Sequence, residues 1–229
     1  MKIPNIINLN KDKARKTFVI SDIHYDHDKP FLYEKRGFAT ITDHNKSFEN
    51  WWYNNVTYED DVINLGDSCF NDGRGEKFDK LSLLPCRSHY YIWGNHNSGA
   101  KQAYQEALYP YGLDPEQELY PVQWNNIRFL GFQAFFKYNS QIIFASHFPS
   151  LIWDAMNKNP PVIAISGHSH GSCSLTSLGN KEGKILDVGV ENALKYNRGF
   201  GFTMEDILSI MKKKTVKFYD HHNDKGDSR

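Results

Sequence analysis

Short apolar runs that end in polar residues recur along the first three quarters of the chain. Thr17–Ile20 is the first of them, and its β-branched and aromatic side chains are typical of a buried strand. Four later runs predict further strands, at 60–65, 88–93, 141–145 and 161–166. Because helical patterns separate several of these strands, the chain is predicted to be an α/β protein.

Apolar residues at helical spacing locate the expected helices. Phe48, Trp51 and Trp52 share one side of a predicted amphipathic helix over 44–55. Shorter helices are expected over 76–84, which Pro85 ends, over 98–108, with Ser98 as the N-cap, and over 150–157.

The rest of the chain has a less regular pattern. Strands are expected over 127–138, joined to 141–145 by an Asn139-Ser140 turn, and over 175–178, 184–190 and 214–219. Thr203, with Asp206 three residues later, predicts the N-cap of a helix that reaches about Lys213. Residues 31–42 and 109–126 are expected to be loops. No linker divides the chain, so one domain over 1–229 is predicted, with flexible ends at 1–16 and 220–229.

Five of the predicted strands finish in a cluster of polar residues. The clusters contain Asp22 and His24, then Asp67, then Asn95 and His96, then His147, and finally His168 and His170. Ligand sites in α/β proteins lie outside the carboxyl ends of strands, so these side chains are expected to meet at one edge. Packing alone does not explain so many candidate ligands there.

The chemistry of these side chains favours divalent metal ions. Asp22 and His24 stand two residues apart in an extended segment and therefore point the same way. Mixed Asp, His and Asn ligands suit borderline first-row ions better than calcium or magnesium alone. A bridging carboxylate lets two such ions lie about 3.5–4 Å apart, where they can activate water and neutralise a phosphoryl oxygen. Their excess charge would attract phosphate.

Composition limits the classes of partner. Twenty-seven basic and twenty-seven acidic residues cancel, so a nucleic-acid partner is possible but charge does not indicate it. Three widely spaced cysteines and the lack of an apolar span predict a reduced cytoplasmic protein without a membrane segment. Arg36 could contact a substrate phosphate, but an ordinary solvated arginine is the stronger expectation. Oligomeric state is not predicted.

Taken in order, the blocks D-x-H, G-D, G-N-H, H and G-H-x-H resemble the calcineurin-like metallophosphoesterase family. They span Asp22 to His170. The stretch 187–191 and the helix after Phe202 also resemble small stand-alone members from bacteria and phages. The resemblance implies a four-layer α-β-β-α sandwich of two mixed sheets, with a dimetal site at the carboxyl ends of the strands.

The resemblance also implies residue roles. Asp22, His24 and His170 would hold one divalent ion, Asn95, His147 and His168 would hold the other, and Asp67 would bridge them. Mn²⁺ is the first expectation for the metal, with Fe, Zn, Ni and Co as alternatives. His96 would be the catalytic imidazole, and a metal-bridging hydroxide would attack phosphorus. The expected enzyme is a phosphoesterase, in the first place a phosphodiesterase acting on a nucleotide or another small phosphoester.

The chain departs from the family pattern in two places. Asn97 stands where many members have an acid after G-N-H, so another group, such as Asp26 or Asp72, is expected to orient His96. The G-D-x-x-D-R-G signature of phosphoprotein phosphatases is absent, because the chain reads Gly66-Asp67-Ser68-Cys69-Phe70-Asn71-Asp72. A protein phosphatase is therefore disfavoured.

Three alternatives remain open. A phosphomonoesterase or a nuclease could use the same residues, and neutral charge disfavours a processive nuclease. A catalytically silent binding scaffold would be expected to lack ligands that this chain retains. A zinc-stabilised nucleic-acid module would need paired cysteines or a basic stripe, and the sequence has neither.

Overall fold

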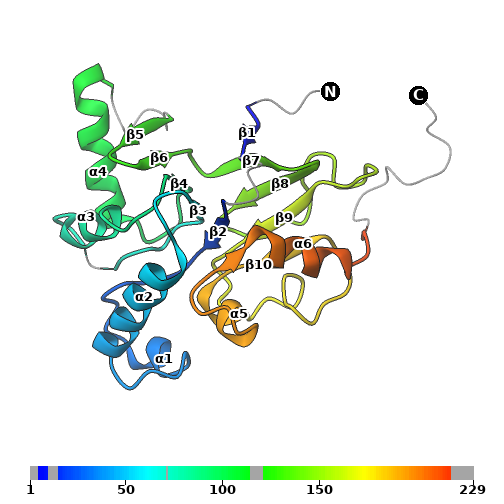
Figure 1. Ribbon diagram of the computed structural model, residues 1–229, viewed down its shortest axis with the longest axis horizontal. Helices are drawn as coiled ribbons and strands as arrows, with labels where there is room; N and C mark the ends of the chain where they lie inside the picture. Colours follow the sequence, from blue (N-terminus) through cyan, green and yellow to red (C-terminus); the bar gives the residue numbers. More distant parts are fainter. Residues whose placement is uncertain (1–4, 10–14, 71, 114–120, 218–229) are drawn as a thin grey trace.

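The computed structural model describes residues 5–9, 15–70, 72–113 and 121–217. Two β-sheets form its centre, and helices lie against them (Figure 1). The fold is therefore α/β with two mixed sheets and helices, which confirms the predicted class at that level. No helix in the described ranges combines the length and the apolar character needed to cross a membrane.

The first sheet has a parallel centre and antiparallel strands at its two sides. In spatial order its strands are β11 (Phe202–Thr203), β2 (Thr17–Ile20), β3 (Asp61–Asn64), β4 (Ser88–Tyr91), β6 (Ile127–Phe129) and β5 (Val122–Trp124). Since β2, β3 and β4 run in the same direction, the segments that follow them leave from one edge of the sheet.

The second sheet combines a hairpin with parallel strands. In spatial order its strands are β1 (Ile7–Asn8), β7 (Gln133–Tyr138), β8 (Gln141–Ser146), β9 (Ile163–Ser166) and β10 (Ile185–Asp187). The short strand β1 pairs with β7, and the adjacent Leu9 is buried. The prediction of a flexible lead-in is therefore wrong for residues 7–9, because their apolar side chains pack on this sheet.

Helices cover mainly the outer face of the first sheet (Figure 1). The helical elements are α1 (Pro30–Tyr33), α2 (Ile41–Asn55), α3 (Glu76–Ser82), α4 (Ser98–Leu108), η1 (Tyr109–Tyr111), α5 (Val190–Lys195) and α6 (Met204–Lys212). Helices α2, α3 and α4 pack on that face, whereas α5 and α6 contribute to the core between the sheets. Thr203 and Asp206 form the predicted cap of α6, each bonding to the other's backbone.

Alternation along the strands of the first sheet builds two cores. Phe18 and Ile20 face the helices, while Val19 between them faces the second sheet. Ile63 of β3 and Ile143 of β8 belong to the core between the sheets and are fully buried. Both sheets are thus held together by apolar contacts, and their carboxyl edges are brought to a common place.

The outer face of the second sheet differs from the expected fourth layer of helix. In the described ranges, its apolar cluster is completed by Trp153, in an irregular segment, and Met156, in a turn. The helix predicted over 150–157 is therefore absent there. Pro149, Pro160 and Pro161 flank this segment, and proline disfavours regular helix around it.

Other boundaries also differ from the predictions. The strand expected over 127–138 is two strands, β6 and β7, which belong to different sheets and are separated near Gly131. Residues 175–178 form turns rather than a strand, and the loop expected over 31–42 begins with part of α1. Of the strand expected over 214–219, Thr215 forms one isolated bridge, and 218–219 lie outside the described residues, as does the 220–229 tail.

Candidate metal centre

The predicted site residues come from both sheets and meet between them. Asp22, Asp67 and Asn95 follow the first-sheet strands β2, β3 and β4. His147 follows β8 of the second sheet, and His168 and His170 follow β9. Backbone bonds tie these segments together within each sheet, as between the Asp22 N–H and Gly66 O at 3.1 Å and between the Gly167 N–H and His147 O at 2.9 Å. Between the sheets, the His168 N–H donates to Asp22 Oδ2 at 2.9 Å.

Two groups of ligand atoms form at this junction. One atom each from Asp22, His24 and His170 lie within 4.8 Å of one another, and the same holds for Asp22, Asp67 and His147. The Asp67 Oδ2 atom is close to both groups, 3.8 Å from His24 Nε2 of the first and 3.5 Å from His147 Nε2 of the second. Both carboxylates are thus placed to be shared, whereas the sequence indicated Asp67 alone.

Asn95 and His168 join the second group. Asn95 Oδ1 lies 3.0 Å from His147 Nε2 and 3.0 Å from His168 Nδ1. Both Asn95 and His168 are exposed, so this side of the centre faces solvent. All seven predicted ligands therefore converge. Five of them are buried or half-buried, and Asn95 and His168 form the exposed side.

Five of these seven residues adopt left-handed backbone conformations. Their φ angles are 58° at Asp22, 52° at His24, 51° at Asp67, 64° at His168 and 48° at His170. Such angles cost on the order of 1–3 kcal/mol each for residues other than glycine, and they cluster at functional sites. The surrounding backbone bonds hold these turns in place and so fix the direction of each side chain.

Each carboxylate uses one oxygen to bond with protein and turns the other toward the centre. Asp22 Oδ2 accepts from Ser21 Oγ at 2.7 Å and from the His168 N–H at 2.9 Å. Asp67 Oδ1 accepts from the His96 N–H at 2.8 Å. Asp22 Oδ1 is left buried without a hydrogen-bond partner among the described residues.

The buried imidazoles follow the same rule. His147 Nδ1 donates to Leu65 O at 2.7 Å, which leaves Nε2 as the ligand atom. His170 Nδ1 lies 2.8 Å from Glu191 Oε1, and His24 Nδ1 lies 3.3 Å from His27 Nδ1. The His24 Nε2 atom is buried and has no hydrogen-bond partner among the described residues.

Burial sets the protonation of the centre. It raises the pKa of Asp22 to about 7, against the lowering effect of the nearby His170. It also lowers the pKa of His24 to about 2, with the charges of His170 and Arg36 acting in the same direction. The two buried carboxylates of Asp22 and Asp67 and the neutral imidazole of His24 can each donate a lone pair to a cation. A bound cation would therefore stabilise this environment.

Arg36 is neither solvated nor free to meet a phosphate, contrary to the prediction. It is only 6% exposed, and its guanidinium donates to Glu191 Oε1 at 2.9 Å, Ile23 O at 2.9 Å and Asp22 O at 2.8 Å. Burial raises the pKa of Glu191, but the bonds and charges of His170 and Arg36 outweigh it and hold the pKa well below its ordinary value. This pair fixes the turn of Asp22 and orients His170.

His96 lies at the edge of the centre without the expected carboxylate partner. Its ring is 5.7 Å from that of His24 and 4.9 Å from that of Phe70, between centroids. Asp72 instead accepts from two backbone N–H groups of α3, and Asp26 bonds with Asn45. Outside the predicted ligands, the His96 ring lies beside Phe70, a residue that the sequence analysis did not single out.

Asn97 has a structural role in the turn that carries His96. Its Oδ1 accepts from Tyr91 Oη and from the Gly94 N–H, each at 3.1 Å, and its Nδ2 donates to Gly94 O. The amide therefore closes the Gly94–Asn97 turn from within. An acid at this position could accept the first two bonds but could not donate the third.

Glu191 and Asp187 support the turn that carries His168 and His170. Asp187 accepts from Ser169 Oγ, from the Gly171 N–H at 2.9 Å and from the Gly189 N–H at 2.7 Å, and so holds the turn with the two histidines. Both acids lie in the 187–191 stretch, which the sequence marked only as a resemblance. Its spacing after a strand was the available signal for their position.

Comparison with known proteins supports the fold and leaves the activity open. No family model matches the chain. The uncharacterized protein MJ1445 of Methanocaldococcus jannaschii is 32% identical over 83 residues, which cover 36% of this chain and 47% of that protein. The match thus spans about half the length of this relative.

One solved structure shares the fold. It is the crystal structure of the protein of unknown function AQ665 from Aquifex aeolicus, with a TM-score of 0.51 and 17% identity, covering 86% of this chain and 99% of that one. The shared architecture supports an α/β protein of two mixed sheets with helices.

Proposed function

We propose that the chain is a phosphoester hydrolase that uses two divalent metal ions and acts on phosphodiesters. The observation that carries this proposal is the pair of buried, unpartnered atoms Asp22 Oδ1 and His24 Nε2 within the converging ligands. A buried polar atom without a partner is costly, and a coordinated cation removes that cost. The donor set also suits first-row ions.

The two groups of ligand atoms suggest which residues would hold each ion. Asp22, His24 and His170 would hold one ion, and Asn95, His147 and His168 the other, with Asp67 Oδ2 facing both. When bound, such a pair of ions polarises phosphoryl oxygens and supplies a nucleophilic water at neutral pH. The protein holds the ligand atoms in place through Arg36, Glu191 and Asp187, which bond to the other side of the same turns.

His96 is suited to proton transfer because it is the exposed imidazole of the cluster that the ligand groups do not require. The carboxylate of Asp67 anchors its backbone, so the ring stays beside the place where a phosphoryl group would lie. An imidazole there can protonate a leaving oxygen.

Two cavities favour a diester over a monoester. One, of about 340 Å³, includes Asn95 and Asn97 in its wall, and the other, of about 430 Å³, includes His168 and His170. The two cavities have no lining residue in common, and each includes at least one predicted ligand residue in its wall. A diester carries a substituent on each side of phosphorus, and each cavity could receive one of them.

The test uses metal-stripped protein with Mn²⁺, Ni²⁺, Zn²⁺ or Mg²⁺ added back. Bis(p-nitrophenyl) phosphate should be hydrolysed only with metal and faster than p-nitrophenyl phosphate. His96→Ala should still bind two ions yet lose about 10²–10⁴-fold in turnover, the range of general acid catalysis. Metal content is measured by elemental analysis.

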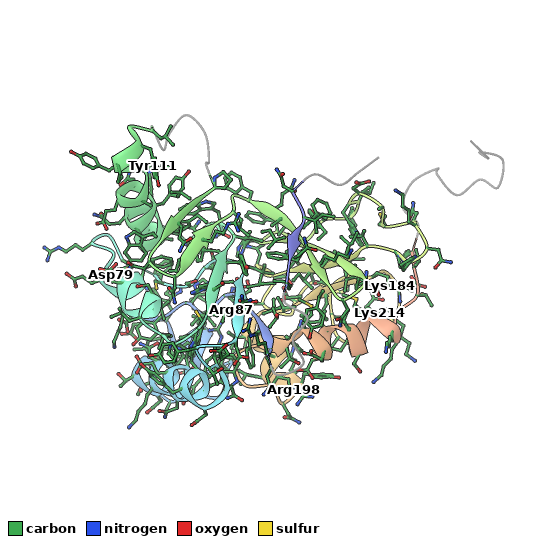
Figure 2. All side chains as sticks on the ribbon, turned by 45° about the horizontal axis from the view of Figure 1, so that its top comes forward. Asp79, Arg87, Tyr111, Lys184, Arg198 and Lys214 are labelled. Carbon is green, nitrogen blue, oxygen red and sulfur yellow. The ribbon has the colours of Figure 1, made fainter. Side chains whose placement is uncertain are left out.

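Asp67→Asn is the variant for the shared ligand, and it should bind fewer ions and lose turnover. Asp79→Asn is its matched control, since Asp79 is an exposed residue of α3 (Figure 2). Two tightly bound ions in Asp67→Asn would contradict the proposed bridge. Absence of hydrolysis with every metal, in protein that binds two ions, would contradict a general phosphoesterase and favour the scaffold alternative.

A further inference from the structure

The cavity beside Asn95 is built for more than simple access to the centre. Its wall contains three aromatic side chains, Trp93, Tyr104 and Phe132, together with Lys101. Asn95 belongs both to this wall and to the ligand cluster, where its Oδ1 lies 3.0 Å from two imidazoles. A group in the cavity would therefore adjoin a phosphoryl group held at the centre.

Trp93 lines this wall and has a buried hydrogen-bond donor that no described residue uses. It is only 6% exposed, and its Nε1 has no hydrogen-bond partner among the described residues. The ring itself is fixed, because it stacks on Phe129 at 5.4 Å and meets Tyr104 edge-on at 5.3 Å, between centroids. A buried N–H that lacks a partner is rare, and an acceptor on a ligand would satisfy it.

Phe132 supplies an exposed apolar face at the same cavity. Its side chain is 65% exposed, although it directly precedes β7 and the Gly131 O atom beside it accepts from the Trp93 N–H at 3.0 Å. Exposed aromatic rings next to a charged groove are typical surfaces for stacking of bases. Lys101 is exposed and adds a positive charge to the wall.

We infer that this cavity binds the planar, acceptor-bearing ring of one ester substituent, so that the substrate is a nucleoside phosphodiester. The inference rests on the proposed function and specifies its substrate class. The ring would stack on Phe132 and accept a hydrogen bond from Trp93 Nε1. An aliphatic substituent offers no acceptor, and an inorganic anion gains nothing from the aromatic wall.

The first test measures binding without turnover. Protein with ¹⁵N-labelled tryptophan and bound Zn²⁺ is titrated with thymidine 5′-monophosphate or with methyl phosphate. The Trp93 indole N–H signal is assigned as the one lost in Trp93→Phe. Thymidine monophosphate should shift this signal, whereas methyl phosphate should leave it in place. An unchanged signal at saturating nucleotide overturns the inference.

The second test compares two chromogenic diesters, the p-nitrophenyl ester of thymidine 5′-monophosphate and methyl p-nitrophenyl phosphate. Phe132→Ala should lower kcat/KM for the nucleoside ester about 5- to 100-fold, as loss of base stacking does. Trp93→Phe, which keeps a ring but lacks the donor, should lower it about 2- to 10-fold. Hydrolysis of the methyl ester should stay within about twofold, because both esters share the p-nitrophenyl leaving group and the methyl ester has only a methyl group in place of the nucleoside.

Tyr58→Ala is the matched control, because Tyr58 is an exposed aromatic residue that precedes β3 and so lies away from the carboxyl edge. Failure of the two proposals looks different. Hydrolysis of both esters with no change of their ratio in Phe132→Ala or Trp93→Phe overturns the cavity inference alone. No hydrolysis of either ester, with a nucleotide-dependent Trp93 shift, overturns the hydrolase and supports the cavity as a nucleotide site.

Discussion

At the scale of single residues, the centre is organised by side chains that each serve two neighbours. Asp22 gives one oxygen to Ser21 and the backbone of His168, and the other faces the cluster. His147 gives Nδ1 to Leu65 O and keeps Nε2 for the cluster. Second contacts of this kind fix side-chain orientation, so affinity for the proposed ions would depend on residues that touch no metal.

Arg36→Met should destabilise the protein by about 3–5 kcal/mol, since removal of one partner leaves the buried Glu191 carboxylate uncompensated. Unfolding in urea measures the loss. Addition of Glu191→Gln to this variant should recover part of it, because the unpaired charge is then gone. Arg74→Met, at an exposed site, should change stability by less than about 0.5 kcal/mol. Equal stability of wild type and Arg36→Met would contradict a stabilising role of the Arg36–Glu191 pair.

The residues that converge at the candidate centre could be predicted from the sequence, and their supports could not. Asp22, Asp67 and His147 each follow an apolar run, and strands end where such runs end. Arg36 and Glu191 are 155 positions apart, and their pairing depends on how the segment after α1 meets α5. A basic residue in a polar segment carries no local sign of burial, which is why a surface position was expected.

At the scale of elements, the turns after β3 and β4 pack so closely that no side chain fits at Gly66 or Gly94. A Cβ on Gly94 would lie 2.1 Å from Asp67 Oδ1, and a Cβ on Gly66 would lie 2.4 Å from the Gly94 backbone nitrogen. Gly66 also has a φ of 95°. The two glycines thus let adjacent strand ends bring Asp67 and the His96 turn together.

Gly94→Ala should therefore displace the Asp67 carboxylate, weaken metal binding and destabilise the fold by about 1–3 kcal/mol, as overpacking does. Metal titration and thermal unfolding measure the two effects. Gly179→Ala is the control, because a Cβ there would meet no atom within 4 Å. Retention of two ions at wild-type affinity in Gly94→Ala would show that Asp67 does not need this space.

Element boundaries were predicted well where the apolar residues of a run pack within one sheet. They were predicted poorly where the chain passes from one sheet to the other. The residues 127–138 look like one strand because apolar residues continue on both sides of Gly131. In the structure, Phe129 packs against α4 and Phe136 packs between the sheets. No local pattern distinguishes one long strand from two short strands in different layers.

The segment just after α6 contains a buried lysine, Lys214, whose charge depends on pH. Lys214 Nζ donates to Ile185 O at 2.8 Å, and the nearby Lys184 Nζ donates to Met211 O at 2.6 Å (Figure 2). Burial, with the positive charge of Lys184, lowers the pKa of Lys214 from 10.5 to about 8. The folded state therefore loses this proton at a pH where the unfolded state keeps it.

Between pH 8 and 10.5, this difference should make the contribution of Lys214 to stability rise with pH. The free energy of unfolding of wild type relative to Lys214→Met should increase by about 1–3 kcal/mol from pH 7.5 to 10, at about 1.4 kcal/mol per pKa unit. Urea unfolding at both pH values measures it. Lys213→Met, at an exposed position, should show no such trend. A pH-independent difference for Lys214→Met would contradict the lowered pKa.

At the scale of the whole molecule, the proposed ions would join the two sheets. Three ligands follow strands of the first sheet and three follow strands of the second, with His24 beside them. Apolar contacts hold the sheets together along their faces. At the carboxyl edge, however, two carboxylates and several imidazoles meet, and a cation would turn that edge into a cross-link.

Metal loading should therefore stabilise the entire fold. At 100 to 1,000 times the dissociation constant, bound metal contributes about 2.7–4.1 kcal/mol. For a chain of this size, that corresponds to a rise in Tm of about 5–15 °C. Calorimetry of stripped and reloaded protein measures it. Asp79→Asn should show the full rise and Asp67→Asn little or none. Equal unfolding temperatures of stripped and loaded protein would rule out the cross-link.

The left-handed turns also limit how such a site can change over generations. At Asp22, His24, Asp67, His168 and His170, the backbone favours glycine, and otherwise aspartate, asparagine and histidine. A descendant without the proposed metal could therefore exchange these residues for one another or for glycine at small cost, whereas valine or isoleucine would deform the loops. Lineages without the proposed activity should still carry these few residue types here, so residue identity alone would overstate how many of them are active.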